Sequence, residues 1–208
     1  MATIPYRWQR WLDLCIFLNV TGYFAWQTWQ GLEAGRIGIL EGVFVIHSAI
    51  LCLCFLLRTP ARAIQTKWSH QVVAIVAFYS GAFFMGPETT DSPLLLQASW
   101  WALMAGMAIG LVSLVQLGKS FGVLIAIRTV RTAGLYGWVR HPMYLSDIVM
   151  RLGFLLSHPS WRTSALFLVS SACYVLRAIL EERFLLDNAP DYAIYMDRVR
   201  YRFVPGIF

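Results

Sequence analysis

Apolar segments of nearly membrane-spanning length recur along this chain, and they limit the folds that it can adopt. A helix needs about 20 apolar residues to cross the roughly 30 Å hydrocarbon core of a bilayer. The candidates are about Leu12 to Trp29, Gly38 to Leu57, Gln71 to Met85, Leu94 to Leu117, Met143 to Leu156 and Trp161 to Leu180. The third and fifth are short for a full crossing, yet hydrophobic residues make up 58% of the chain, too many for a soluble domain. We therefore predict an all-α integral membrane protein with about six transmembrane helices, the last two forming a helical hairpin.

The basic residues favour one orientation of these helices. If both termini face the cytoplasm, 13 of the 17 Lys and Arg residues lie on the cytoplasmic side, as the positive-inside rule requires. Arg36 and Arg162 then fall on the other side, with Arg151 and Arg177 at membrane depth. The basic residues form no continuous run, so the net charge of +6 does not indicate nucleic-acid binding. We expect a multi-pass protein whose loop 118–141 and C-terminal tail share the cytoplasmic side.

We divide the chain into N-terminal transmembrane helices, residues 1–117, and a C-terminal region, residues 118–208, that carries the candidate chemistry. In the first part Ala102, Gly106 and Gly110 put small residues on one helix face, which permits close helix contact but indicates no activity. The cysteines have neither the spacing nor the partners of a zinc or redox site, so we predict no metal site.

The stretch from Gly134 to Tyr144 combines charge, aromatic rings and a proline between two apolar segments. Pro142 suits the first position of a helix, where its missing N–H costs nothing. His141 then lies at the helix mouth, whose N–H groups and dipole attract an anion, with Tyr144 in the first turn. Because a basic, aromatic helix entry also anchors membrane helices at the headgroups, this stretch alone leaves a structural interpretation open.

Two arginine–carboxylate pairs lie at helical spacing in the hairpin. Arg177 and Glu181, like Asp147 and Arg151, are four residues apart and so share a helix face. Charges at membrane depth are costly unless compensated, so each pair either clamps the hairpin or serves the chemistry. His47 in the second segment is also deep, and there we favour a helix-to-helix hydrogen bond over a substrate contact.

An ordered set of motifs runs through the last part of the chain. It comprises Gly134, Tyr136, Val139-Arg140-His141-Pro142 and Tyr144, then Arg177 with Glu181-Glu182, then Tyr192, Tyr195 and Arg198-Val199, and finally Arg202 with Pro205-Gly206. With these motifs, residues 117–208 resemble the isoprenylcysteine carboxyl methyltransferase family and, more distantly, phospholipid N-methyltransferases. Ser146 stands where that family usually has a glycine.

The resemblance implies a membrane methyltransferase with S-adenosylmethionine as methyl donor, bound in a cytoplasm-facing pocket that the tail closes. The cofactor would be bound by Arg128, Thr129, Val130, Arg131, Tyr136, His141, Pro142, Met143, Tyr144 and Glu181. Arg177 and Glu181 would be catalytic, and Arg177 with Arg198 would bind the acceptor. That acceptor would be a lipophilic or lipidated molecule entering from the membrane lipid, most directly an isoprenylcysteine-like carboxylate.

Other chemistry stays open at this point. An amine or a thiol acceptor would make the chain a lipid N- or S-methyltransferase. Sterol reductases are similar in the C-terminal arrangement, and the basic Arg128 and Arg131 would suit the 2′-phosphate of NADPH. A non-catalytic membrane scaffold, in which the charged pairs only clamp helices, is a third interpretation.

Overall fold

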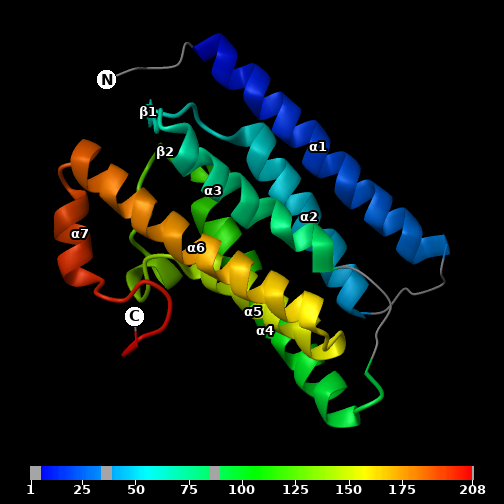
Figure 1. The fold of residues 1–208 in the computed structure, drawn as a ribbon. Helices are drawn as coiled ribbons and strands as arrows, with labels where there is room; N and C mark the ends of the chain where they lie inside the picture. Colours follow the sequence, from blue (N-terminus) through cyan, green and yellow to red (C-terminus); the bar gives the residue numbers. More distant parts are fainter. Residues whose placement is uncertain (1–5, 34–38, 85–89, 208) are drawn as a thin grey trace.

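The computed structural model describes residues 6–33, 39–84 and 90–207, and these are mostly helical (Figure 1). The elements are α1 (Tyr6–Glu33), α2 (Ile39–Leu57), β1 (Ala63–Ile64), α3 (Trp68–Tyr79), the 3-10 turn η1 (Ser80–Phe84), α4 (Pro93–Leu117), η2 (Gly118–Ser120), β2 (Ala126–Ile127), η3 (Gly134–Gly137), α5 (Pro142–Ser157), α6 (Trp161–Asn188) and α7 (Tyr192–Arg198). Each predicted apolar segment therefore contains a helix, although the segment ends Gly38 and Met85 lie outside the described residues.

The sixth helix is longer than the apolar pattern predicts. It starts where Ser160 accepts a hydrogen bond from the Thr163 N–H at 3.2 Å in a capping box, which satisfies a free donor of the first turn. It then continues past Leu180 to Asn188, for 28 residues in all. The added turns carry the acidic residues of the candidate site, so these side chains project from a rigid helix.

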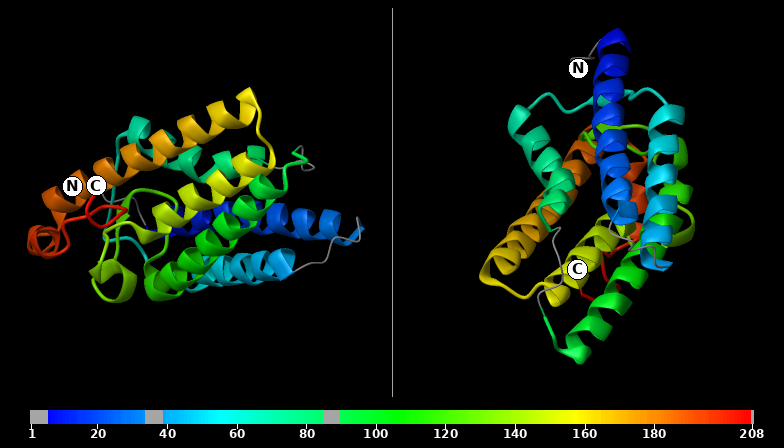
Figure 2. Two further views of the ribbon diagram at one scale, coloured as in Figure 1. Left: turned by 90° about the horizontal axis from the view of Figure 1, so that it is seen from below. Right: turned by 90° about the vertical axis from the view of Figure 1, so that its right-hand side faces the viewer.

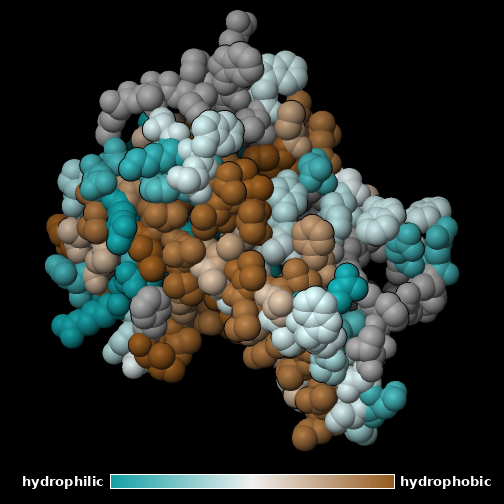
Figure 3. Space-filling view, in the orientation of Figure 1, coloured by the Kyte–Doolittle hydropathy of each residue, from teal (hydrophilic) through white to brown (hydrophobic). Residues whose placement is uncertain are grey.

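The surface is consistent with a helical membrane protein. Within the described residues, Pro93–Ser120 and Trp161–Asn188 are long and apolar enough to cross a membrane. Large apolar side chains on their outer faces are exposed, including Trp101 at 62% and Leu168 at 67%. Figure 3 shows apolar side chains over the middle of one face and hydrophilic ones at the end that carries α7. Such an apolar surface is suited to contact with the hydrocarbon chains of lipid.

The elements at the two ends of the helix bundle differ in kind. The start of α1, the β1–β2 pair, the end of α6 and α7 gather at one end, whereas the α5–α6 turn and the start of α4 lie at the other (Figures 1 and 2). The loop, helix ends and tail that the sequence assigns to one side therefore lie together. The predicted position of Arg36 lies outside the described residues.

Helices α4 and α5 pack closely because glycines replace side chains at their contact. A Cβ added to Gly106 would lie 2.6 Å from Cγ of Met150, and one added to Gly153 would lie 2.7 Å from Cγ of Leu103. Both distances are too short for a real carbon, so neither glycine tolerates a larger residue without a shift. The predicted close contact along the small-residue face of α4 is confirmed.

The segment between α4 and α5 contains a short strand that the all-α prediction missed. β2 pairs with β1 in antiparallel register, and Gln71 of α3 holds the segment from the side. The Gln71 amide nitrogen donates to the carbonyl of Ile125 at 3.1 Å, and its Oε1 accepts the Ile125 N–H at 3.0 Å. Val123 and Ile125 are buried, while the alternate residues Leu124 and Ala126 line a cavity.

The C-terminal tail folds back over the start of α5. The backbone N–H groups of Arg140 and His141 both donate to tail carbonyls at 2.9 Å. On α7, the hydroxyl of Tyr195 donates to the carbonyl of Tyr136 at 2.7 Å. Tyr192 and Tyr195 are buried in this contact, so the tail is part of the folded structure.

Candidate active site

A cavity of about 710 Å³ lies among the helices, within the range of about 300–1,000 Å³ typical of small-molecule sites. Most of the predicted site residues line it: Arg128, Thr129, Val130, Arg131, Tyr136, His141, Met143, Tyr144, Arg177 and Glu181. Pro142 occupies the first position of α5, as predicted, but does not line the cavity. Arg198 is exposed on α7 and is not part of the lining either.

Glu181 and Tyr144 form a polar centre in the cavity lining. The hydroxyl of Tyr144 donates to Oε2 of Glu181. Among the described residues, no lysine or arginine lies within ion-pair distance of Glu181. The Glu181 carboxylate is therefore fixed in place, and it can still accept hydrogen bonds from a ligand or face a cation.

Arg177 does not form the ion pair with Glu181 that their spacing suggested. Its Nη2 donates to the carbonyls of Gly122 and Val123 at 3.2 and 2.6 Å, and its Nη1 donates to the carbonyl of Ala74 at 3.4 Å. Arg177 bonds to these carbonyls instead of Glu181 because α3 and the segment before β2 both pack against this face of α6. Arg177 thus fastens that segment to α3 and α6.

Although Arg177 bonds to these carbonyls, it also lines the cavity. Its Cζ lies 4.7 Å from the ring centroid of Tyr144, in cation–π contact. Its Nε has no hydrogen-bond partner among the described residues, although the residue is only 4% exposed. Because buried donors are rarely left unpaired, an acceptor atom of a bound ligand is a natural partner.

Glu182, next to Glu181, holds a buried ion network that sequence reasoning missed. Its Oε1 accepts from Arg140 Nε at 2.7 Å and lies 3.1 Å from His141 Nε2, while its Oε2 accepts from Arg202 Nε at 2.8 Å. Consecutive helical residues point about 100° apart, so Glu181 faces the cavity while Glu182 faces the tail. Arg140, Glu182 and Arg202 all belong to the motifs that carry the family resemblance, but the sequence predicts no ion network among them.

The residues just before α5 are covered by the tail, a contact between distant parts of the chain that local sequence cannot reveal. The N–H groups of Arg140 and His141 donate to tail carbonyls, and an anion site at the first turn of α5 stays a prediction. The His141 ring lies against Glu182 and stacks on Tyr144, with centroids 5.0 Å apart. His141 therefore lies at the edge of the cavity, where its ring orients the ring of Tyr144.

Arg128 and Tyr136 line the cavity from the loop that precedes α5. Arg128 Nε donates to the carbonyl of Thr59 at 3.1 Å, and burial lowers the pKa of its guanidinium while the charge of Glu181 raises it. Burial, together with the nearby Glu181 carboxylate, raises the pKa of Tyr136 far above its usual range. Tyr136 is therefore a neutral phenol at any physiological pH.

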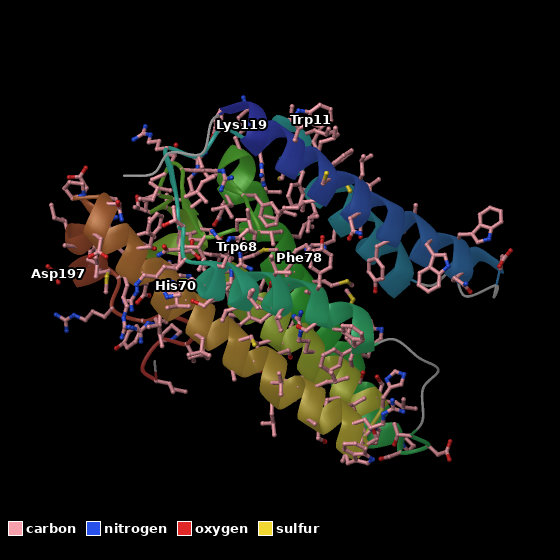
Figure 4. All side chains as sticks on the ribbon, turned by 45° about the horizontal axis from the view of Figure 1, so that its top comes forward. Trp11, Trp68, His70, Phe78, Lys119 and Asp197 are labelled. Carbon is pink, nitrogen blue, oxygen red and sulfur yellow. The ribbon has the colours of Figure 1, made fainter. Side chains whose placement is uncertain are left out.

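Another part of the lining is apolar. Leu18 and Trp26 come from α1, Leu51 from α2, Phe78 from α3 (Figure 4) and Phe154 from α5. Apart from the indole N–H of Trp26, these side chains carry no hydrogen-bonding group, and they can bury a hydrocarbon chain. The same cavity thus joins a polar part to an apolar part, which suits an amphiphilic ligand.

The second predicted pair is present, since Arg151 Nη1 lies 3.6 Å from Asp147 Oδ1. Tyr174 donates to Asp147 Oδ2 at 2.7 Å. His47, which is 5% exposed, also lines the cavity, and its Nε2 has no hydrogen-bond partner among the described residues. The helix-to-helix hydrogen bond that we favoured for His47 is therefore not made by Nε2.

Comparison with known proteins supports the resemblance seen in the motifs. A protein-family model described as the isoprenylcysteine carboxyl methyltransferase family matches residues 98–187, and no curated protein matches the chain. The matched region runs from α4 almost to the end of α6 and includes Tyr144, Arg177 and Glu181, whereas the tail lies beyond it. A membrane methyltransferase is the activity that this family supports. Residues 98–187 thus match the same family that the sequence motifs indicated, the isoprenylcysteine carboxyl methyltransferase family.

Proposed function

We propose that this chain uses S-adenosylmethionine to methylate the carboxylate of a lipophilic, isoprenylcysteine-like acceptor. The observation that carries the proposal is the composition of the cavity, which has both the Glu181–Tyr144 centre and a large apolar lining. A lipid methyltransferase needs both parts, because its donor is polar and its acceptor is amphiphilic.

The polar part of the cavity fits this donor. The Glu181 carboxylate has no cationic partner among the described residues, so it can accept from amino or hydroxyl groups of the donor. The rings of Tyr136 and Tyr144 offer faces for an adenine or a sulfonium cation. The loop residues 128–131, which also belong to the predicted binding set, border the same cavity.

The residues of the site act by placement and by exclusion of water. When bound, S-adenosylmethionine supplies a methyl group activated by its sulfonium for in-line displacement. An ionised carboxylate needs no general base to attack it, so the enzyme contributes mainly orientation and desolvation. Arg177 offers to the acceptor carboxylate its Nε–H, which has no partner in the described part of the chain. Since Glu181 follows Arg177 by one turn, about 6 Å along the axis, α6 sets the distance between acceptor and donor.

The proposal includes six membrane-embedded helices with both termini and the polar part of the cavity on the cytoplasmic side. It is supported by the positive-inside count and by the gathering of the α1 start, the α6 end and α7 at one end of the bundle (Figure 1). Cysteines introduced at Thr90 and Asp197 should react with an impermeant reagent from opposite sides of sealed vesicles. Reaction from the same side contradicts this topology.

Donor binding is tested by titration calorimetry of the purified protein in detergent. S-adenosylhomocysteine should bind to the wild type, and more weakly to Glu181→Gln, while NADPH should give no saturable heat. Binding of NADPH without S-adenosylhomocysteine favours a reductase, and binding of neither favours a scaffold. Arg183→Gln is the matched control, because Arg183 is exposed on the same helix and does not line the cavity.

A further inference from the structure

The methyl transfer proposed above leaves part of the cavity unexplained. His47 on α2, Asp147 and Arg151 on α5, and Tyr174 on α6 form what we call the inner polar cluster. His47, Asp147 and Arg151 line the cavity, among the apolar side chains that would hold a lipid tail. A hydrocarbon tail needs no polar partners, so this cluster indicates an additional recognition task.

Most polar atoms of the inner polar cluster have partners within the protein. Arg151 Nη1 donates to the Asp147 carbonyl at 3.1 Å, and its Nη2 donates to the carbonyl of Ala77 at 3.0 Å and to Ser80 Oγ at 3.3 Å. The guanidinium also lies over the Tyr174 ring, 4.8 Å from its centroid. These contacts hold the Arg151 side chain in one position in the cavity wall.

Two atoms of the cluster remain without a hydrogen-bond partner among the described residues. They are Nε2 of His47 and Nε of Arg151, in side chains that belong to residues only 5% and 4% exposed. Buried polar atoms are almost always paired, with protein, water or a ligand. Arg151 Nε can only donate, whereas His47 Nε2 donates or accepts according to its tautomer. Both therefore suit a ligand oxygen that has lone pairs.

The cluster lies at a defined distance from the polar centre. On α5, Asp147 and Arg151 follow Tyr144 by three and seven residues, which corresponds to about 5 and 10 Å along the helix axis. His47 lies close to Ser146, the residue before Asp147, because a Cβ added to Gly110 would lie 3.3 Å from His47 Nε2 and 3.0 Å from Ser146 Oγ. An acceptor with its reacting group near Tyr144 would therefore place its tail against the cluster.

We propose that the methyl acceptor carries, on its lipophilic tail, an uncharged oxygen that hydrogen-bonds to the inner polar cluster. This inference rests on the proposed function for the assignment of the tail. The charges of Asp147 and Arg151 lie 3.6 Å apart and compensate each other, so the cluster does not require a charged ligand. A plain isoprenyl chain would leave His47 Nε2 and Arg151 Nε without a hydrogen-bond partner among the described residues. A hydroxyl or carbonyl oxygen on the tail would pair at least one of these atoms, and the substrate class is an oxygenated lipid carboxylic acid.

Binding in lipid nanodiscs, without any methyl donor, tests the proposal independently of donor chemistry. The probes are hexadecanoic acid and a series of its hydroxy and oxo derivatives, each substituted at a successive chain carbon. Their affinities are measured by displacement of a fluorescent hexadecanoic acid from the wild type, His47→Leu and His47→Gln. Comparing the ratio of affinities between variants removes differences in how the probes partition into lipid.

One position of substitution should bind to the wild type about tenfold more tightly than the plain acid, as one or two buried hydrogen bonds allow. That preference should be lost in His47→Leu and kept in His47→Gln, whose amide reaches the place of Nε2. If His47→Leu does not fold, His47→Asn replaces it, because its shorter amide cannot reach that place. The proposal is overturned if no derivative exceeds the plain acid in the wild type, as expected when internal water alone pairs these atoms. It is also overturned if the preference survives in His47→Leu.

Discussion

Arg140 and Glu182 form an ion pair, with Nε 2.7 Å from Oε1, in which neither side chain is more than 6% exposed. Arg140 immediately precedes the α5 cap, and Glu182 lies near the end of α6. The Nη1 of Arg140 also donates to the carbonyls of Val199 and Arg200 at 2.7 and 2.6 Å. One arginine thus joins both helices of the hairpin to the C-terminal tail.

Replacing Glu182 should destabilise the whole hairpin end. Glu182→Gln removes the negative charge that Arg140, His141 and Arg202 share, and a buried cation left unpaired costs about 3 kcal/mol. The unfolding temperature in detergent should fall clearly, while that of the exposed control Arg183→Gln should not. An unchanged unfolding temperature in Glu182→Gln would show that the network does not hold the tail.

The Tyr144 hydroxyl should matter for donor binding more than for folding. Tyr144→Phe keeps the ring that stacks on His141 but removes the hydrogen bond to Glu181, so the carboxylate is no longer fixed. The dissociation constant for S-adenosylhomocysteine should rise about tenfold, with little change in unfolding temperature. Tyr201→Phe, at a partly exposed ring outside the cavity, is the control. Equal affinity in wild type and Tyr144→Phe would remove Glu181 from the donor site.

Arg177 should tolerate no conservative replacement. Arg177→Lys keeps the charge, but an ammonium cannot reach the carbonyls of Ala74, Gly122 and Val123 together and still lie over Tyr144. We expect kcat with a carboxylate acceptor to fall at least about tenfold, and the unfolding temperature to fall as well. Steady-state kinetics and thermal unfolding on the same sample separate the two effects. Near-normal turnover of the carboxylate acceptor in this variant would show that Arg177 does not orient the acceptor carboxylate.

The α4–α5 contact offers a matched pair of glycine substitutions. Gly106→Ala forces a carbon to within 2.6 Å of Met150 Cγ and should cost about 1–3 kcal/mol, because the helices must separate. Gly22→Ala in α1 meets nothing within 4 Å and should be neutral or slightly stabilising. Denaturation of the two variants in the same detergent checks the difference. If Gly106→Ala were as stable as Gly22→Ala, close packing at this contact would not be required.

The helices could be predicted from the sequence because their signals are local. Apolar segments near membrane length locate the helices, and Pro142 and Ser160 mark helix starts through the geometry of the first turn. The close contact at Gly106 followed from small residues at helical spacing. Each of these inferences needs only residues within a few turns of one another.

The partners of the charged site residues could not be predicted, because they come from distant parts of the chain. Arg177 bonds to carbonyls 54, 55 and 103 residues away, and no side-chain pattern marks a carbonyl as a partner. Helical spacing correctly gave the Asp147–Arg151 pair but wrongly suggested a pair between Arg177 and Glu181. Spacing shows which side chains can meet, whereas the tertiary fold decides which of them do.

The central claim, that donor and lipid acceptor meet in one cavity for carboxyl methylation, is tested most directly by product chemistry. The purified protein is incubated in lipid nanodiscs with methyl-labelled S-adenosylmethionine and N-acetyl-S-farnesylcysteine, and the extracted lipid is treated with mild base. A methyl ester releases its label as volatile methanol, whereas N- and S-methyl products do not. We predict label in the wild-type lipid that mild base releases, and strongly reduced label with Glu181→Gln. Label that resists base would contradict carboxyl methylation, and the absence of label from this acceptor and from other lipid carboxylic acids would contradict the account as a whole.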